Sequence, residues 1–443
     1  MPTVAPNEPA PDRPLLERLS SQLLPELRRY LSQHRAAVEQ QIEAGALDCG
    51  VDAGRRYAKV YDGLLSALFH AARTAMLREG TWVPLALGAV GSYGRSALSP
   101  HSDLDVRMIV SRDPESAAAA AEALLYPLWD AGLSIGHQVV TPEGVIELAR
   151  SDLPTATSLT DWRTITSDSE VARELLDRAF QGVFGPGDLT AFLERLHKSA
   201  NERHARFGGS VFLLEPDVKN GEGGLRDLDI AHWSARARWR VSDLGELVRI
   251  GVLVPREWAE IEAAREFLFR VRNNLHLAAG RRADRLSFEQ QERIALQLGY
   301  GEGGSGVEHF MSDYYRQARA IARAREMILA RATPPPRRRP RETHLGAGLK
   351  IQAGAVSLVN AEELYHDPAL ALRLYDEAVK RSLPVYDFAR HAVARAAASP
   401  AFCEGLRASP EAAEIFLRLV CVVQETPLRR GSVLHDLHDA GLL

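Results

Sequence analysis

One stretch, "LGAVGSYGRSALSPHSDLDVRMIV" from Leu87 to Val110, constrains the fold most. Two apolar segments bracket a Gly-Ser pair and two aspartates, and short apolar segments bounded by glycine and polar residues are typical of buried strands. Because strand side chains alternate between two faces, Asp103 and Asp105 share one face with Arg107. The apolar residues between them share the other face. The sequence therefore predicts a strand with one face in a core and one face that carries charge.

Two carboxylates on one face, about 7 Å apart at Cα, repel each other unless a cation lies between them. Mg²⁺ prefers carboxylate oxygens and bridges nucleotide phosphates, so Asp103 and Asp105 are candidate metal ligands and catalytic residues. Upstream, Gly91 lets the backbone approach a ligand, and Ser92 offers an N–H and a hydroxyl to a phosphate. Arg95 adds positive charge nearby. The alternative is a surface strand with two solvated aspartates, which an isolated D-x-D more often indicates.

A second unusual stretch is "FLLEPDVKNGEGGLRDLDIAHW" at residues 212–233. It predicts a glycine-rich loop that opens a helix at about Leu225. Lys219 and Arg226 are candidate nucleotide-binding residues, because an ammonium and a planar guanidinium both bind triphosphate oxygens. The glycine spacing fits neither a Walker loop nor a dinucleotide-binding fingerprint. The alternative is a capped surface turn surrounded by charged residues.

The bulk composition excludes several classes of protein. The 443 residues carry a formal net charge of -4, which implies no global attraction to nucleic acid or to an anionic membrane. The three cysteines show no CxxC spacing, so a disulfide framework is not expected. No apolar run is long enough for a membrane span, and the N-terminus lacks the apolar segment of a signal peptide. We therefore expect a cytoplasmic protein.

The pattern along the chain predicts an α+β, mostly helical fold, in which a small α/β domain is embedded in a large helical domain. After that α/β domain the chain reads as almost wholly helical, and the Pro- and Arg-rich "TPPPRRRPRET" interrupts the helices. The expected segments are a disordered tail at 1–14, helices at 15–80, the α/β domain at 81–165, a helical domain at 166–332, a linker at 333–343 and a mainly helical segment at 344–443.

These motifs resemble a known family. "GSYGRSALSPHSDLDV" is similar to the signature of the polymerase-β-like nucleotidyltransferase superfamily. Together with "LWDAGLSIGHQVVTP", "NERHARFGGSVFLLEPDVKNGEGGLRDL", "RNNLHLAAGRRADRLSFEQQERIALQLGY" and "GVEHFMSDYYRQA", in that order over about residues 60–330, it resembles the bifunctional uridylyltransferase/uridylyl-removing enzyme that acts on the PII signalling protein. The resemblance implies a polymerase-β-like α/β domain at 81–165 and a uridylyltransferase-type helical domain at 166–332.

The resemblance also implies an activity: transfer of UMP from UTP to a tyrosine of a PII-type protein, with release of pyrophosphate. Gly91 and Ser92 would hold the triphosphate, and Asp103 and Asp105 would ligate Mg²⁺, for which Mn²⁺ can substitute. The expected partners are PII and UTP, with no membrane and no nucleic acid. Two alternatives stay open: a nucleotidyltransferase that uses ATP or another acceptor, and a catalytically silent module that binds nucleotide or PII.

The sequence departs from the superfamily pattern at the third carboxylate, which members often carry on a later strand. The corresponding "SIGHQVVT" has His137 and Gln138 but no acid. Among nearby acids we place Asp152 first, before Glu143 and Asp161, and His137 is a second candidate for the general base. A structural histidine at a strand end is the alternative for His137.

The C-terminal "PLRRGSVLHDLHDAGLL" is similar to the helical segment that precedes the family's HD phosphohydrolase domain. Neither the HD metal constellation nor the ACT domains of the family are visible in this chain. We therefore expect uridylyl-removing activity to be absent, and we interpret the HD dipeptide at 435–441 as a helix end. The basic stretches at 203–207 and 272–286 are candidates for contacts in the cleft or for structural pairs, and 334–341 reads as a solvated linker.

Overall fold

The computed structural model describes residues 13–45, 49–168, 170–173, 175–334, 342–421 and 433–443. The chain forms two compact units, residues 1–334 and 335–443. The predicted tail lies outside the described residues up to position 12, as does the predicted linker from 335 to 341. In the described ranges, no helix combines the length and the apolar character that a membrane span requires.

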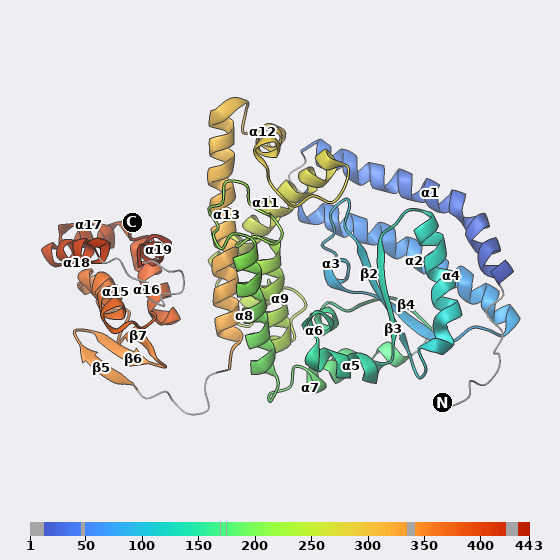
Figure 1. Cartoon of the computed structure of the whole chain (residues 1–443), viewed down its shortest axis with the longest axis horizontal. Coiled ribbons are helices and arrows are strands. Elements are labelled where there is room, and N and C mark those ends of the chain that lie inside the picture. The colour runs from blue at the N-terminus through green and yellow to red at the C-terminus, as the bar shows by residue number, and fades with distance from the viewer. Residues whose placement is uncertain (1–12, 46–48, 169, 174, 335–341, 422–432) are drawn as a thin grey trace, which may run out of the picture. The chain divides into compact units, whose positions relative to one another are not determined.

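The first unit places a small sheet among helices (Figure 1). Two long helices lead into the sheet, and a helical layer follows it. The elements are α1 (Arg13–Glu43), α2 (Val51–Glu79), β1 (Leu85–Ala89), α3 (Gly91–Gly94), β2 (Leu104–Val110), η1 (Glu115–Ala117), α4 (Ala118–Asp130), β3 (Ile135–Val140), α5 (Pro142–Ser151), α6 (Leu153–Thr160), β4 (Arg163–Ser167), η2 (Glu170–Ala172), α7 (Leu175–Gly182), α8 (Leu189–Arg206), α9 (Leu225–Trp239), α10 (Glu246–Arg249), α11 (Pro255–Ala279), α12 (Phe288–Gln297) and α13 (Gly303–Ala332).

The four strands run in the order β3-β2-β1-β4. β1 is antiparallel to both β2 and β4, whereas β2 and β3 are parallel. The parallel pair needs a crossover connection, and α4 supplies it. In the register of this pair Asp105 lies beside Gly136, and Val106 lies beside His137.

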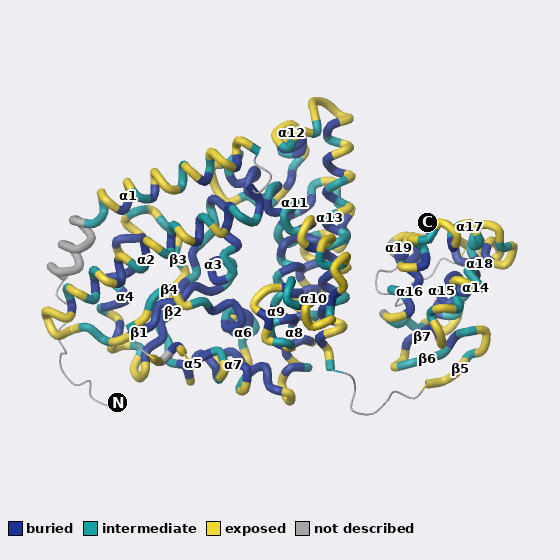
Figure 2. Tube along the Cα trace, turned by 180° about the vertical axis from the view of Figure 1, so that it is seen from behind, coloured by how far each residue is buried: buried dark blue, intermediate teal, exposed yellow. Residues whose placement is uncertain are grey.

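The two faces of the sheet pack against different helices, and β1 and β2 are buried throughout most of their length (Figure 2). Leu104, Val106 and Met108 face the core that α1, α2 and α4 complete. Ile109 and Trp162 belong to the opposite core, which includes residues of α5 to α8. The predicted alternation along β2 is therefore confirmed: its apolar set is buried, and Asp105 emerges on the other face.

A third core joins α9, α11, α12 and α13 with the glycine-rich loop before α9. The loop is fixed from two sides. Its Val218 N–H donates to the carbonyl of Asp284 at 2.8 Å, and the Leu286 N–H donates to the carbonyl of Pro216 at 2.9 Å. This pairing brings the segment that follows α11 beside the loop that precedes α9.

The predicted fold class, α+β and mostly helical, is confirmed. One strand was not predicted, because the α/β pattern seemed complete after β3. β4 has the sequence "RTITS" and pairs with β1 on the edge opposite β3. Its run of three β-branched residues, Thr164 to Thr166, is a strand signal, but its length of 5 residues makes that signal weak.

The second unit combines a three-stranded antiparallel sheet with helices. The elements are β5 (Thr343–Gly346), β6 (Leu349–Gln352), β7 (Ala355–Leu358), α14 (Glu363–His366), α15 (Ala369–Arg381), α16 (Asp387–Ala397), α17 (Pro400–Ala408), α18 (Pro410–Cys421) and α19 (Val433–Asp439). The HD dipeptide lies in α19. Among the described residues, no group of three His, Cys, Asp or Glu side chains is placed to hold a metal ion.

Candidate active site

Asp105 is held at the start of β2 by the glycines around it. A Cβ atom on Gly136 would lie 2.6 Å from its Oδ1, and one on Gly91 would lie 3.1 Å from its Oδ2. Gly91 also has φ +60°, which disfavours other residues. The backbone closes the arrangement, because the Val90 N–H donates to the carbonyl of Asp105 at 3.0 Å. The Gly-Ser turn therefore sits directly against the carboxylate, as the sequence predicts.

Asp103 precedes β2, and its side chain is 44% exposed. Its Oδ2 accepts a hydrogen bond from Nη1 of Arg282 at 2.9 Å. Burial and the charge of Asp103 raise the pKa of Asp105, and the positive charges of Lys219, Arg226 and Arg282 oppose that rise. The structure thus gathers both predicted metal ligands and both cations of the second motif, and it adds Arg282.

Lys219 lies in the glycine-rich loop. Burial, reinforced by the charges of Arg272, Arg226 and Arg282, lowers its pKa to about 8. Among the residues that the structure describes, none forms an ion pair with its ammonium group. A half-buried ammonium without a counter-ion, set among other cations, is suited to an anionic ligand.

Arg226 lies in the first turn of α9, and part of its guanidinium is engaged by neighbouring side chains. Its Nη1 donates to Oδ2 of Asp229 at 3.0 Å, and its guanidinium lies 5.5 Å from the ring centroid of Trp233. The side chain keeps a third of its surface exposed, so one edge of the guanidinium fork stays accessible.

A buried network under the site fixes the loop. Asp227 accepts hydrogen bonds from the Gly223 N–H at 2.8 Å and from Arg203, and it lies 2.9 Å from Nε2 of His204. Burial alone would raise the pKa of Asp227, but the hydrogen bond with His204 and the charges of Arg325 and Arg203 hold it well below its usual range. The geometry therefore gives Arg203 and His204 a structural role, which is one of the two alternatives for the stretch 203–207.

Arg95, a candidate nucleotide-binding residue, lies close enough to Asp105 for their charges to interact, and it is also held by two acidic partners. Its buried side chain pairs with Asp161 and, at 2.8 Å, with Asp229, and it lies 5.5 Å from the ring centroid of Trp233. Two buried carboxylates therefore use its charge. Arg95 joins the sheet domain to α9, and sequence spacing alone cannot reveal partners so distant in the chain.

Each candidate for a third carboxylate has a structural partner of its own in the structure, and Asp152 also lies near Arg107. Asp152 caps α6, where its Oδ2 accepts from the Thr155 N–H at 2.7 Å. Asp161 is committed to Arg95, and Glu143 pairs with Arg178 on the surface. His137 lies beside Val106, hence on the opposite face of the sheet from Asp105, 5.5 Å from the ring of Trp129.

On the face that carries Asp105, β3 contributes Gly136, Gln138 and Val140. Arg107 occupies the same face of β2, beside Gln138. It is buried, and its Nε and Nη1 have no hydrogen-bond partner in the described structure. A buried guanidinium with unpaired donors, two residues from Asp105, is a functional candidate that the sequence analysis placed on this face without giving it a role.

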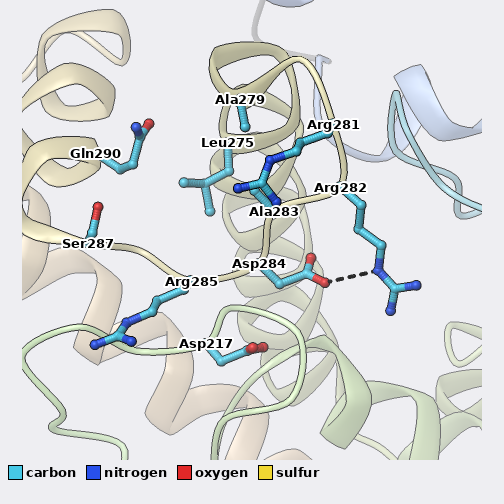
Figure 3. A pocket seen from close by; sticks show the side chains of 10 residues that line it. All are labelled: Asp217, Leu275, Ala279, Arg281, Arg282, Ala283, Asp284, Arg285, Ser287 and Gln290. Atoms are coloured by element: carbon cyan, nitrogen blue, oxygen red, sulfur yellow. Dashed lines mark ion pairs between the residues drawn. The ribbon is translucent and has the colours of Figure 1, made fainter.

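A pocket of about 700 Å³ lies beside the loop that carries Arg282, the partner of Asp103 (Figure 3). Its lining includes Asp217, Leu275, Ala279, Arg281, Arg282, Ala283, Asp284, Arg285, Ser287 and Gln290. Arg282 points to one side of the loop, where Nε lies 3.6 Å from Oδ2 of Asp284, whereas Arg281 and Arg285 point to the side of Ser287 and Gln290. Asp284 is anchored by Arg272 at 2.6 Å. The sequence analysis had assigned Asp284 and Arg282 no catalytic role.

Paired aspartates on a sheet, a Gly-Ser turn against them and cations supplied by a helical layer define a protein of the nucleotidyltransferase type. Residues 191–329 match the family model described as GlnD PII-uridylyltransferase. That part of the chain is therefore similar to the GlnD PII-uridylyltransferase domain, in agreement with the resemblance inferred from the motifs. The matched range contains Lys219, Arg226 and Arg282.

Similarity extends beyond that domain. The chain is 32% identical over 438 residues to the bifunctional uridylyltransferase/uridylyl-removing enzyme of Phenylobacterium zucineum, an alignment that covers 94% of this chain and 46% of the relative. The enzyme of the same name from Nitrobacter hamburgensis is 34% identical over 378 residues, covering 81% of this chain and 40% of the relative. The chain spans about half the length of the curated relatives it matches.

Proposed function

We propose that this protein transfers UMP from UTP to a tyrosine hydroxyl of a PII-type protein and releases pyrophosphate. The observation that carries the proposal is the gathering of Asp103, Asp105, Lys219, Arg226 and Arg282 at one point. These residues come from three segments of the chain, each of which lies in one of the motifs that resemble the family. The names of the relatives and of the family model support a uridylyl group and a PII protein, while UTP and the tyrosine hydroxyl are what the resemblance implies.

The donor set suits Mg²⁺, or Mn²⁺ in its place. Mg²⁺ is commonly bound by one or two carboxylates together with substrate phosphates and water, so a third protein ligand is not required. Burial and mutual repulsion make the two charges of Asp103 and Asp105 unfavourable when they stand alone. A divalent cation held by them would neutralise charge on the α-phosphate and keep the attacking oxygen in line.

The residues of the chain perform the remaining tasks. The first amides of α3, at Gly91 and Ser92, have no partner within their own helix and can bind phosphate oxygens. Lys219 and Arg226 face the same site from the helical layer and stabilise the charge that develops on the leaving pyrophosphate. No step requires His137, which lies on the opposite face of the sheet. Asp152 caps α6 and lies near enough to Arg107 for their charges to interact, so it remains a candidate near this face.

A catalytically silent module is the second candidate, and one observation favours it. The face of β3 that adjoins Asp105 carries no acid. Arg282 also forms an ion pair with Asp103, one of the two candidate metal ligands. Such a protein binds nucleotide or PII without turnover. The intact pair of aspartates, with cations on either side, supports the transferase instead.

One assay separates these functions. The protein is incubated with Mg²⁺, a PII protein and either labelled UTP or labelled ATP, and the label fixed on PII is measured. We expect label from UTP, and its loss in Asp103→Asn. Label from ATP alone moves the assignment to adenylylation. Nucleotide binding by calorimetry without any transfer establishes the silent module.

A further inference from the structure

Three large apolar side chains lie exposed on the loops that frame the pocket: Phe212, Leu214 and Phe288, hereafter the apolar rim. Leu214 is 70% exposed, more than any other large apolar side chain that the structure describes, and Phe288 is 57% exposed. Monomeric proteins rarely gather such residues on rigid surfaces without a binding role. Nothing in the proposed chemistry uses them.

The rim is held rigidly. Glu215 joins its two loops, because Oε1 accepts from the Phe288 N–H at 3.0 Å and Oε2 pairs with Arg285 at 2.7 Å. Gln291 donates to the carbonyl of Leu214 at 2.6 Å. Leu214 and Phe288 therefore project from backbone that is fixed by hydrogen bonds, and a partner that binds them loses little entropy in ordering the surface.

The rim continues into the basic side of the pocket. Arg285 reaches from the pocket to Glu215, and Arg281 points to the same side in Figure 3. Arg281 is exposed, and among the described residues it has no ion-pair partner. The acids of the lining are satisfied internally: Asp284 pairs with Arg272, and Asp217 accepts from the Lys219 N–H at 3.0 Å. Arg281 therefore offers an accessible positive charge on the pocket side of this surface.

We propose that the apolar rim and Arg281 form the docking surface for the acceptor protein, which binds through a loop that carries apolar side chains beside an acidic residue. The inference rests on the proposed function. A protein fits better than the nucleotide, because polyphosphate requires cations and the rim offers apolar area as well. The surface also lies at the correct place, since Arg282 in the same loop contacts Asp103.

The test uses the double variant Leu214→Ser/Phe288→Ser, the single variant Arg281→Glu and the control Ile250→Ser. Ile250 is a 46% exposed apolar residue outside the rim and the pocket, so it reports the effect of removing exposed apolar area elsewhere. Each protein is assayed for uridylylation of PII, for UTP affinity by calorimetry and for thermal unfolding. Binding of PII to the immobilised chain is measured by interferometry with a non-hydrolysable UTP analogue.

We expect the double variant and Arg281→Glu each to raise the KM for PII by about tenfold or more, the scale of losing a hot-spot contact. The kcat, the UTP affinity and the melting temperature should be unchanged. Ile250→Ser should match the wild type. A wild-type KM for PII in the double variant overturns the inference and leaves the proposed function standing. A wild-type chain that binds UTP but neither binds nor modifies PII overturns both. Variants that change only self-association of the chain assign the rim to a second copy, which also overturns the inference.

Discussion

The two charged clusters of this molecule lie next to each other and differ in one respect. Around Asp227, Arg203, His204 and the Gly223 amide satisfy the carboxylate, and the resulting pKa lies below the usual range. Around Asp105 the pKa is raised, because burial and Asp103 outweigh the nearby cations. A satisfied cluster stabilises the fold, whereas a cluster left incomplete has a free-energy incentive to bind the missing ion.

The largest expected effect is on the satisfied cluster. Asp227→Asn leaves buried cations without a counter-ion and should lower the free energy of unfolding by about 3–5 kcal/mol. Because the folded pKa of Asp227 is depressed, its contribution is present above the unfolded pKa of about 3.9 and is lost as the pH falls below it. Urea unfolding at pH 7 and at pH 3.5 should therefore show a smaller difference from the wild type in acid.

The control for this prediction is Asp177→Asn, which removes a largely exposed acid that lies 3.7 Å from Arg240. Its cost should stay within about 1 kcal/mol. Equal destabilisation by the two substitutions would show that the Asp227 network carries no special weight.

The same substitution in the incomplete cluster should do the opposite. Asp105→Asn should reduce transfer to PII by roughly 10²–10³-fold, as expected for the loss of one preorganised electrostatic contact. It should not lower the melting temperature, because the raised pKa of Asp105 shows that its charge is unfavourable in the folded protein. Kinetics and calorimetry on one preparation check both halves, and a destabilised variant that keeps its activity would refute the assignment.

A pH titration sharpens the comparison on the cation side. The lowered pKa of Lys219, about 8, means that the ammonium loses its proton as the pH rises above that value. Affinity for UTP should therefore fall by up to about tenfold between pH 8 and 9. Lys219→Arg keeps its charge at every pH used and should give a flat profile in calorimetry. A falling profile in this variant would place the titrating group elsewhere.

The smallest effect, on metal affinity, is expected at Arg282, because this residue forms an ion pair with the candidate metal ligand Asp103. Its side chain is 49% exposed, so the ion pair is weak. Arg282→Gln should raise the affinity for Mn²⁺, measured by electron paramagnetic resonance without nucleotide, by at most about fivefold. Arg281→Gln, its neighbour, should leave Mn²⁺ affinity unchanged. Weaker Mn²⁺ binding in Arg282→Gln would mean that the guanidinium assists the metal rather than competing with it.

Features that depend only on residues close in the sequence could be predicted from local periodicity. The face shared by Asp103 and Asp105, the glycine beside them and the glycine loop that opens α9 all follow from spacing within one segment. The role of Asp152 was also readable: an aspartate followed by Leu-Pro is typical of a helix N-cap, which is its observed position.

Partners far apart in the sequence were not predictable from such patterns. Arg282 meets Asp103 across 179 positions, and Arg95 meets Asp229 across 134. The face on which His137 lies could not be predicted either, since it depends on the register between β2 and β3, which neither strand specifies alone.

The loop that follows α11 has a consequence for how this protein can be divided. It sends Arg282 to the sheet domain, and through Asp284 and Arg285 it holds the segment before α9. A fragment that ends after β4 would retain both aspartates and the Gly-Ser turn, yet it would lack every cation that acts on Asp105 from the helical layer. A graft of the sheet domain onto another scaffold would therefore have to include the loop after α11 to keep the cations of the site.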